Sequence, residues 1–172
     1  MVVVYIGIGS NLNSPIKQVK TAIVNLAILP KTMILNHSSF YQSRPVGPQD
    51  QPNYINAVVT LETRLSPEAL LKALQALEEN QGRERSGTRW RARTLDLDIL
   101  LYGKSVIQTE TLSIPHPHLK VREFVLYPLF EIAPNLILPT GDSVLALKAL
   151  CPKKGIKKLI DRISMNFIED FK

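Results

Sequence analysis

The chain has 172 residues, of which 45% are hydrophobic and 21% are charged, and its formal net charge is +6. This composition is typical of a globular protein with a full hydrophobic core, and it predicts a single domain over residues 1–172. The sequence contains no run of about 18 uncharged apolar residues and no basic start of a signal peptide, which excludes a transmembrane helix. Cys151 is its one cysteine, which excludes an internal disulfide framework and favours the cytoplasm.

The first 30 residues predict a strand, a turn and a helix. Residues 2–7 are a β-branched run, and the Gly-Ile-Gly-Ser-Asn sequence at 7–11 is typical of a strand end followed by a turn. Ser14 and Pro15 then predict an N-cap and the first position of a helix. Apolar residues at helical spacing extend this helix to Pro30.

Two more strands and a second helix are predicted next. Residues 34–42 and 54–62 have strand patterns, and the long proline-rich loop between them is typical either of a functional loop or of a surface excursion. Ser66-Pro67-Glu68 predicts the start of a helix that ends at Gly82. Tyr54 and Asn56 lie on one face of the strand over residues 54–62. Gln75 and Glu78 lie on one face of the helix that ends at Gly82.

A strand that carries Asp96 and Asp98 follows an arginine-rich segment, so the order of elements is β-α-β-β-α-β. This is the order of the ferredoxin-like split unit, which has an antiparallel sheet and mixed α/β (α+β) structure. A hairpin around Gly103-Lys104 and a mixed helical end interrupted by prolines are predicted beyond it.

The two aspartates are the most informative residues of the chain. They lie two positions apart in an otherwise apolar strand, so both side chains point to the same face, about 6 to 7 Å apart. Carboxylates held this close repel each other unless a shared proton, a basic group or a divalent cation offsets their charge. Hard oxygen ligands without a His or Cys cluster favour Mg²⁺, which normally also binds substrate phosphates.

The segment before this strand supplies the positive charge that phosphates need. A guanidinium group matches phosphate oxygens in a two-bond fork and stabilises charge during phosphoryl transfer. The segment contains five arginines and one acid. The arginines are Arg83, Arg85, Arg89, Arg91 and Arg93.

Other features of the sequence leave alternatives open. The net positive charge and the aspartate pair also fit a Mg²⁺-dependent nucleic-acid enzyme or binder, although the basic segment 153–158 contains no aromatic residues on which bases could stack. A nucleotide-binding regulatory domain without turnover is a third possibility. The P-loop motif is absent, and residues 7–12 lack the third glycine of a dinucleotide fingerprint. His116 and His118 have no third ligand nearby, so a phosphate contact or no role at all fits them better than a metal site.

Several motifs together resemble the 6-hydroxymethyl-7,8-dihydropterin pyrophosphokinase family. They occur in the family's order between about Val4 and Pro139. The motifs are YIGIGSNL at 5–12, PVGPQDQPNYINA at 45–57, LE at 77–78 with GR at 82–83, RTLDLDILLYG at 93–103 and IPHP at 114–117.

This resemblance implies a fold and a reaction. The implied fold is a three-layer α/β/α relative of the ferredoxin-like unit, with additional C-terminal elements. The implied enzyme is an ATP-dependent diphosphotransferase that transfers pyrophosphate from ATP to the pterin hydroxymethyl group and releases AMP in folate biosynthesis. It uses ATP as co-substrate and two Mg²⁺ ions. We expect a monomer that acts on these small molecules and binds neither nucleic acid nor membrane.

The resemblance also implies the roles of individual residues. The implied catalytic residues are Arg83, Arg93, Asp96 and Asp98, and both aspartates are implied metal ligands. The pterin site comprises Ser43, Val46, Gly47, Tyr54, Asn56, Trp90, Asp96 and Phe124. The ATP site comprises Gln75, Glu78, Arg85, Trp90, Arg93, Ile99, Ser113, His116 and Arg122.

Two loops, 43–53 and 83–93, are expected to act as lids that exclude water from ATP, with Gly47, Gly82 and Gly87 as hinges. The chain departs from the common family pattern at two places near the site. Relatives commonly have Gly-Pro where this chain has Arg91-Ala92, and they often have an aromatic residue in place of Pro117.

Overall fold

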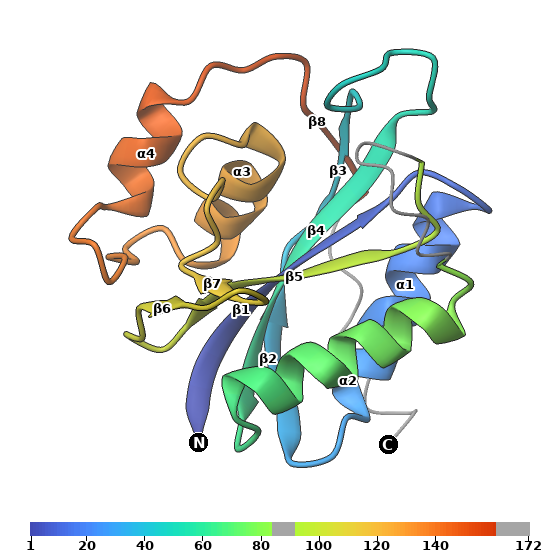
Figure 1. Ribbon diagram of the computed structural model, residues 1–172. Coiled ribbons are helices and arrows are strands. Elements are labelled where there is room, and N and C mark those ends of the chain that lie inside the picture. The colour runs from blue at the N-terminus through green and yellow to red at the C-terminus, as the bar shows by residue number, and fades with distance from the viewer. Residues whose placement is uncertain (84–91, 161–172) are drawn as a thin grey trace.

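A six-stranded antiparallel sheet lies between two layers of helices in the computed structural model, which describes residues 1–83 and 92–160 (Figure 1). The strand order is β5-β1-β4-β3-β8, and β2 also pairs with β4. A separate two-stranded ribbon joins β6 to β7. The strands are β1 (Val2–Ser10), β2 (Thr32–His37), β3 (Phe40–Ser43), β4 (Tyr54–Thr63), β5 (Asp96–Tyr102), β6 (Ile107–Gln108), β7 (Ser113–Ile114) and β8 (Lys157–Ile160).

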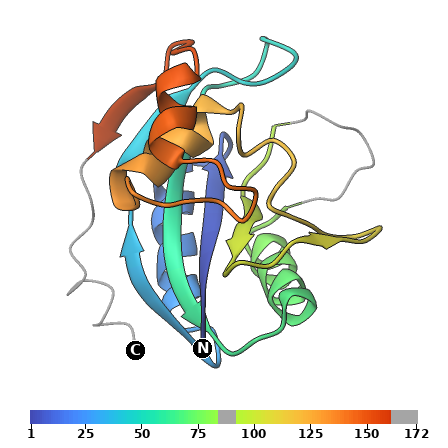
Figure 2. The ribbon, with the colours of Figure 1, turned by 90° about the vertical axis from the view of Figure 1, so that its left-hand side faces the viewer.

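Two helices cover each face of the sheet. The first pair is α1 (Pro15–Ala27) and α2 (Pro67–Asn80), and the second is α3 (Glu123–Ile132) and α4 (Val144–Leu150). In Figure 2, α3 and α4 lie in front of the sheet and α1 lies behind it. The observed layers and element order confirm the predicted three-layer α/β/α fold.

Alternation along the strands produces a separate hydrophobic core on each face. In β1, Val4, Ile6 and Ile8 are at most 3% exposed and belong to the cluster that packs under α1 and α2. Val58 of β4 and Leu100 of β5 belong instead to the cluster under α3 and α4. The residues between these positions in β1 therefore face α3, and this second face holds the functional site.

The predicted strand over residues 34–42 is wrong in one respect, because the structure divides it into β2 and β3. The break is at Ser38 and Ser39, which are buried. The Ser38 hydroxyl accepts a bond from the Val58 amide at 3.0 Å, and Ser39 donates from its amide and its hydroxyl to the Glu131 carboxylate. These bonds replace regular ladder pairing at the break.

Three turn predictions also differ from the structure. β1 continues through Gly7 and Gly9 to Ser10 instead of ending in a turn at Gly7, because both glycines pair with neighbouring strands on each side. β5 ends at Tyr102 and a turn at Gly103 follows it, but the hairpin forms later, between β6 and β7. Ser14 precedes α1 in a left-handed conformation without a side-chain cap, whereas Ser66 caps α2 by accepting a bond from Ala69 at 3.2 Å.

The C-terminal part contains a strand that the sequence did not predict. β8 pairs antiparallel with β3, and Lys158 lies 3.7 Å from the Glu131 carboxylate on α3. Within residues 1–83 and 92–160, no helix is both long and apolar enough to cross a membrane.

Candidate active site

Two glycines of β1 form the floor of the candidate site. Gly9 lies opposite Asn56 of β4 and Asp96 of β5, and Gly7 is the register partner of Asp98. A Cβ atom on Gly9 would lie 3.6 Å from the Asn56 Oδ1 atom and 3.9 Å from the Asp96 Cβ atom. Because glycine has no side chain, there is a hollow, an open space above β1, between the side chains of β4 and those of β5.

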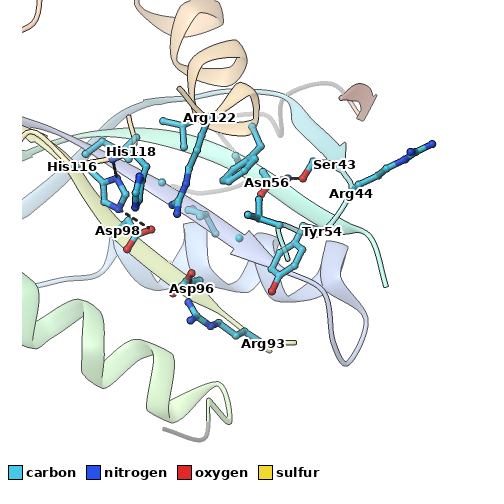
Figure 3. Close-up of a pocket in the computed structure, with 18 residues that line it drawn as sticks. Ser43, Arg44, Tyr54, Asn56, Arg93, Asp96, Asp98, His116, His118 and Arg122 are labelled. Atoms are coloured by element: carbon cyan, nitrogen blue, oxygen red, sulfur yellow. Dashed lines mark hydrogen bonds and ion pairs between the residues drawn. The ribbon is translucent and has the colours of Figure 1, made fainter. Parts of the chain in front are cut away.

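The hollow opens into a cavity of about 350 Å³ between the sheet and the start of α3. In Figure 3, Asp96 and Asp98 point into this cavity from β5, and Tyr54 and Asn56 border it from β4. The cavity brings together ten of the predicted site residues. They are Ser43, Val46, Tyr54, Asn56, Arg93, Asp96, Asp98, His116, Arg122 and Phe124.

Asp96 is held by two arginines from opposite ends of the arginine-rich segment. One of its oxygens accepts a bond from Arg83 at 2.7 Å, and the other accepts a bond from Arg93 at 2.6 Å. Both carboxylate oxygens therefore have a basic partner, and the two guanidinium groups converge at one edge of the cavity.

Glu78 of α2 connects this ion-pair group to the sheet. It is 3% exposed and forms a salt bridge with Arg83. The same carboxylate accepts the backbone N–H of Leu97 at 2.7 Å. Arg83 thus bridges α2 and β5 and lies beside Asp96, although Arg83 does not itself line the cavity.

Asp98 differs from Asp96 because its neighbours include no close basic partner within the described residues. Burial, followed by repulsion from Asp96, raises the pKa of Asp98 to about 7, although Arg122 and Arg93 act in the opposite direction. Burial and the charge of Arg122 lower the pKa of His116 to about 4. His116 is therefore neutral at pH 7, and its 3.8 Å approach to Asp98 is not an ion pair under those conditions.

The other end of the cavity is an aromatic and amide-lined pocket. Asn56 is 4% exposed and donates to the Ser43 hydroxyl at 2.9 Å, which fixes its amide. The Arg122 guanidinium lies 5.5 Å from the ring centre of Phe124. Tyr54 is only partly buried, and this burial raises its pKa. A flat, polar ring system would find both stacking and hydrogen-bonding groups here.

The charge and donor set of the two aspartates fit a hard divalent cation. A cation between them would offset the repulsion that raises the pKa of Asp98. In the described parts of the chain, no three His, Cys, Asp or Glu side chains gather into a metal cluster. Two carboxylates with room for substrate oxygens match the way proteins bind Mg²⁺.

The remaining predicted residues that the structure describes lie outside the cavity lining. Ile99 is 4% exposed and belongs to the core under α1 and α2, because it alternates with the aspartates. Gly47 has a φ of 96° in the loop before β4, a conformation that favours glycine, and its role as a hinge stays a prediction. Gln75 lies on α2 and Ser113 on β7. Arg85, Trp90 and the predicted hinge Gly87 lie outside the described residues, as do Arg89 and Arg91.

Sequence reasoning missed several residues that line the cavity. Gly7 and Gly9 were assigned to a turn, although their alternation with Ile6 and Ile8 was a signal that both point to one face. Arg44 also lines the cavity, and Figure 3 shows it extending outward from it. No local pattern marks Arg44, since only the tertiary fold brings its segment to the site. His118, for which the sequence left a phosphate contact or no role open, lines the cavity as well.

The sequence matches the family described as 7,8-dihydro-6-hydroxymethylpterin-pyrophosphokinase (HPPK) over residues 5–134. It is 51% identical to a Haemophilus influenzae 2-amino-4-hydroxy-6-hydroxymethyldihydropteridine pyrophosphokinase, in an alignment that covers 91% of this chain and 98% of the relative. The protein of the same name from Pseudomonas aeruginosa is 47% identical, with 91% and 96% coverage.

Solved structures show the same fold. A crystal structure of HPPK-DHPS in complex with substrates has a TM-score of 0.67 and 13% identity, and the match covers 87% of this chain. A Plasmodium falciparum HPPK-DHPS with pterin and p-hydroxybenzoate has a TM-score of 0.68 and 13% identity, over 86% of this chain. This chain spans 45% and 43% of those longer chains.

Proposed function

The chain belongs to the HPPK family and is a pyrophosphokinase of folate synthesis, and we propose that its cavity transfers pyrophosphate from ATP to 6-hydroxymethyl-7,8-dihydropterin. The pterin hydroxyl oxygen attacks the β-phosphorus and releases its proton, the bond from that phosphorus to the α-phosphate oxygen breaks, and AMP leaves. One observation carries this proposal. The aspartate pair and the Tyr54–Asn56 pocket open into one cavity across the Gly9 floor.

The pocket beside β4 is the proposed pterin site. The Asn56 Nδ2 atom donates to the Ser43 hydroxyl and to the Tyr41 carbonyl, so its Oδ1 atom is held in a fixed orientation and can accept a bond from the pterin ring. Phe124 offers a face for stacking, and Val46 and Tyr54 also line the cavity. Gly47 lies in the adjoining loop, and Trp90 is proposed as a further contact from the family resemblance.

The aspartate and arginine end is the proposed nucleotide site. Arg93, His116 and Arg122 line the cavity, and Arg83 lies beside it through Asp96. Arg83 and Arg93 are available to exchange Asp96 for phosphate oxygens, because carboxylate and phosphate accept the same guanidinium fork. From the family resemblance, we also assign ATP contacts to Gln75, Glu78, Arg85, Trp90, Ile99 and Ser113.

We propose that Asp96 and Asp98 hold two Mg²⁺ ions. When bound, Mg²⁺ supplies charge that stabilises the triphosphate and orients it. The protein itself aligns the two substrates and presents arginines to the developing negative charge, so positioning and electrostatics account for most of the catalysis. The loops 43–53 and 83–93 are proposed to limit access of water, since hydrolysis of ATP is the competing reaction.

Family membership supports this function over the two alternatives, a nucleic-acid enzyme and a regulatory domain without turnover. We also propose that the protein acts as a monomer, as the family resemblance implies, and that it acts in the cytoplasm, where a chain with a single cysteine stays reduced.

The direct test is a coupled assay of nucleotide products. Purified protein with Mg-ATP and 6-hydroxymethyl-7,8-dihydropterin is expected to release AMP in equal amount to the pterin diphosphate. Asp96→Ala is expected to abolish this release, whereas Lys20→Ala, an exposed change on α1, is the matched control that should retain it. Release of ADP, or no product from the folded protein, would contradict the proposal.

A further inference from the structure

Asn11, directly after the last residue of β1, joins three segments of the site through one side chain. It is 2% exposed. Its Oδ1 atom accepts the backbone N–H of Arg93 at 2.7 Å, and its Nδ2 atom donates to the Pro52 carbonyl at 3.1 Å. The same Nδ2 atom lies 3.4 Å from the Gln51 Oε1 atom. The Asn11 backbone N–H also donates to the Arg93 carbonyl at 3.0 Å.

This set of partners requires a carboxamide. One side of Asn11 faces an N–H donor and the other faces a carbonyl acceptor, so the orientation of the amide is determined by its neighbours. A carboxylate keeps the bond to Arg93 but has no hydrogen to give to Pro52. A hydrocarbon side chain loses both bonds and leaves the Arg93 N–H and the Pro52 carbonyl without this partner.

The three joined segments carry different parts of the proposed reaction. Arg93 bonds Asp96 at the nucleotide end, and Pro52 lies two residues before Tyr54 at the pterin end. Asn11 itself follows the strand whose Gly9 forms the floor between the two ends. One buried side-chain amide therefore links the two walls of the site.

We propose that Asn11 is a positioning residue that couples the nucleotide half of the site to the pterin half. This inference rests on the proposed function, because it takes the Asp96 end as the nucleotide site and the Tyr54 end as the pterin site. Asn11 holds the backbones of Arg93 and Pro52 at a fixed separation, so a ligand that orders one wall also orders the other.

The test compares two substitutions that break different numbers of these bonds. Asn11→Asp keeps the Arg93 bond and removes the Pro52 bond, so it is expected to raise the KM for the pterin at least about fivefold and to leave the KM for ATP within about twofold. Asn11→Ala removes both side-chain bonds. It is expected to lower kcat about tenfold or more. In this variant, the Kd of the pterin measured with and without a non-hydrolysable Mg-ATP analogue should differ by no more than about twofold.

Ile34→Val is the control for loss of stability alone, since Ile34 is 4% exposed in the core of β2 and does not line the cavity. It should lower the thermal midpoint without changing either KM. Equal changes in both KM values for Asn11→Asp, or unchanged coupling in folded Asn11→Ala, would overturn the inference. Wild-type protein that binds neither ligand would instead overturn the proposed function.

Discussion

At the residue scale, Asp98 lies in surroundings that favour a protonated carboxyl group. Burial and Asp96 raise its pKa to about 7, above its ordinary value of 3.8. Between these two values the folded state binds more protons than the unfolded state. In protein without metal, the free energy of unfolding is therefore expected to decrease as pH rises from about 4 to about 7.

Asp98→Asn is expected to remove this pH dependence. Thermal midpoints measured without Mg²⁺ at pH 5 and pH 8 should converge in the variant, and at pH 8 the variant should be more stable than the wild type. It should nevertheless lose most activity, because one of the two proposed metal ligands is gone. A variant that is less stable at pH 8 would show instead that Asp98 is a stabilising ion-pair partner.

Arg83 and Arg93 both bond Asp96, yet their removal should affect stability differently. Removal of either arginine leaves Asp96 with the other one as a partner. Removal of Arg83 also takes the basic partner from Glu78, whose side chain is 4% exposed. Arg83→Ala is expected to lower the free energy of unfolding by about 1–3 kcal/mol, the usual cost of removing a partner from a buried charged group. Arg93→Ala should cost less. Urea denaturation of both variants measures the difference, and equal losses would contradict the expected role of Glu78.

At the element scale, the glycines of β1 make a strand into the floor of a cavity. A Cβ atom on Gly9 meets its nearest neighbours at 3.6 Å or more, which is ordinary contact. Gly9→Ala should therefore fold, but its methyl group occupies the hollow between Asn56 and Asp96. We expect a rise in the KM for the pterin of about tenfold, which corresponds to about 1.4 kcal/mol of lost binding.

Steady-state kinetics with the pterin as the varied substrate measures this effect. Val3→Ala is the control, because Val3 lies on the same strand but is 39% exposed and does not line the cavity. Unchanged pterin kinetics in Gly9→Ala would mean that the substrate does not approach the floor.

The same elements show what a sequence can and cannot predict. Strong local signals predicted α2, with its Ser66 cap, and the alternating face of β4. The break between β2 and β3 was not predicted, because it depends on the bond from Ser39 to Glu131 on a distant helix. Glycine favours turns in local statistics, so Gly7 and Gly9 were misassigned where strand pairing decides the conformation.

At the scale of the whole molecule, the order of the elements and the family resemblance predicted the fold class. Most of the proposed site residues were also named from the sequence, and ten of them line one cavity. The contacts of Asn11 could not be predicted, since they connect residues 40 or more positions apart. The single domain over 1–172, the cytoplasmic location and the individual ligand contacts stay predictions.

The pairing of β8 with β3 has a consequence for the behaviour of the protein in concentrated solution. Without β8, the N–H and C=O groups of β3 would form an open sheet edge, and such edges pair with other chains. Lys158→Pro removes a donor within β8 and is expected to cause concentration-dependent self-association in sedimentation velocity. Lys158→Ala loses only the charge near Glu131 and should sediment like the wild type. β8 thus takes the edge position of the sheet in place of β3, and Lys157 and Lys158 place charged side chains on that edge, where they oppose pairing with other chains.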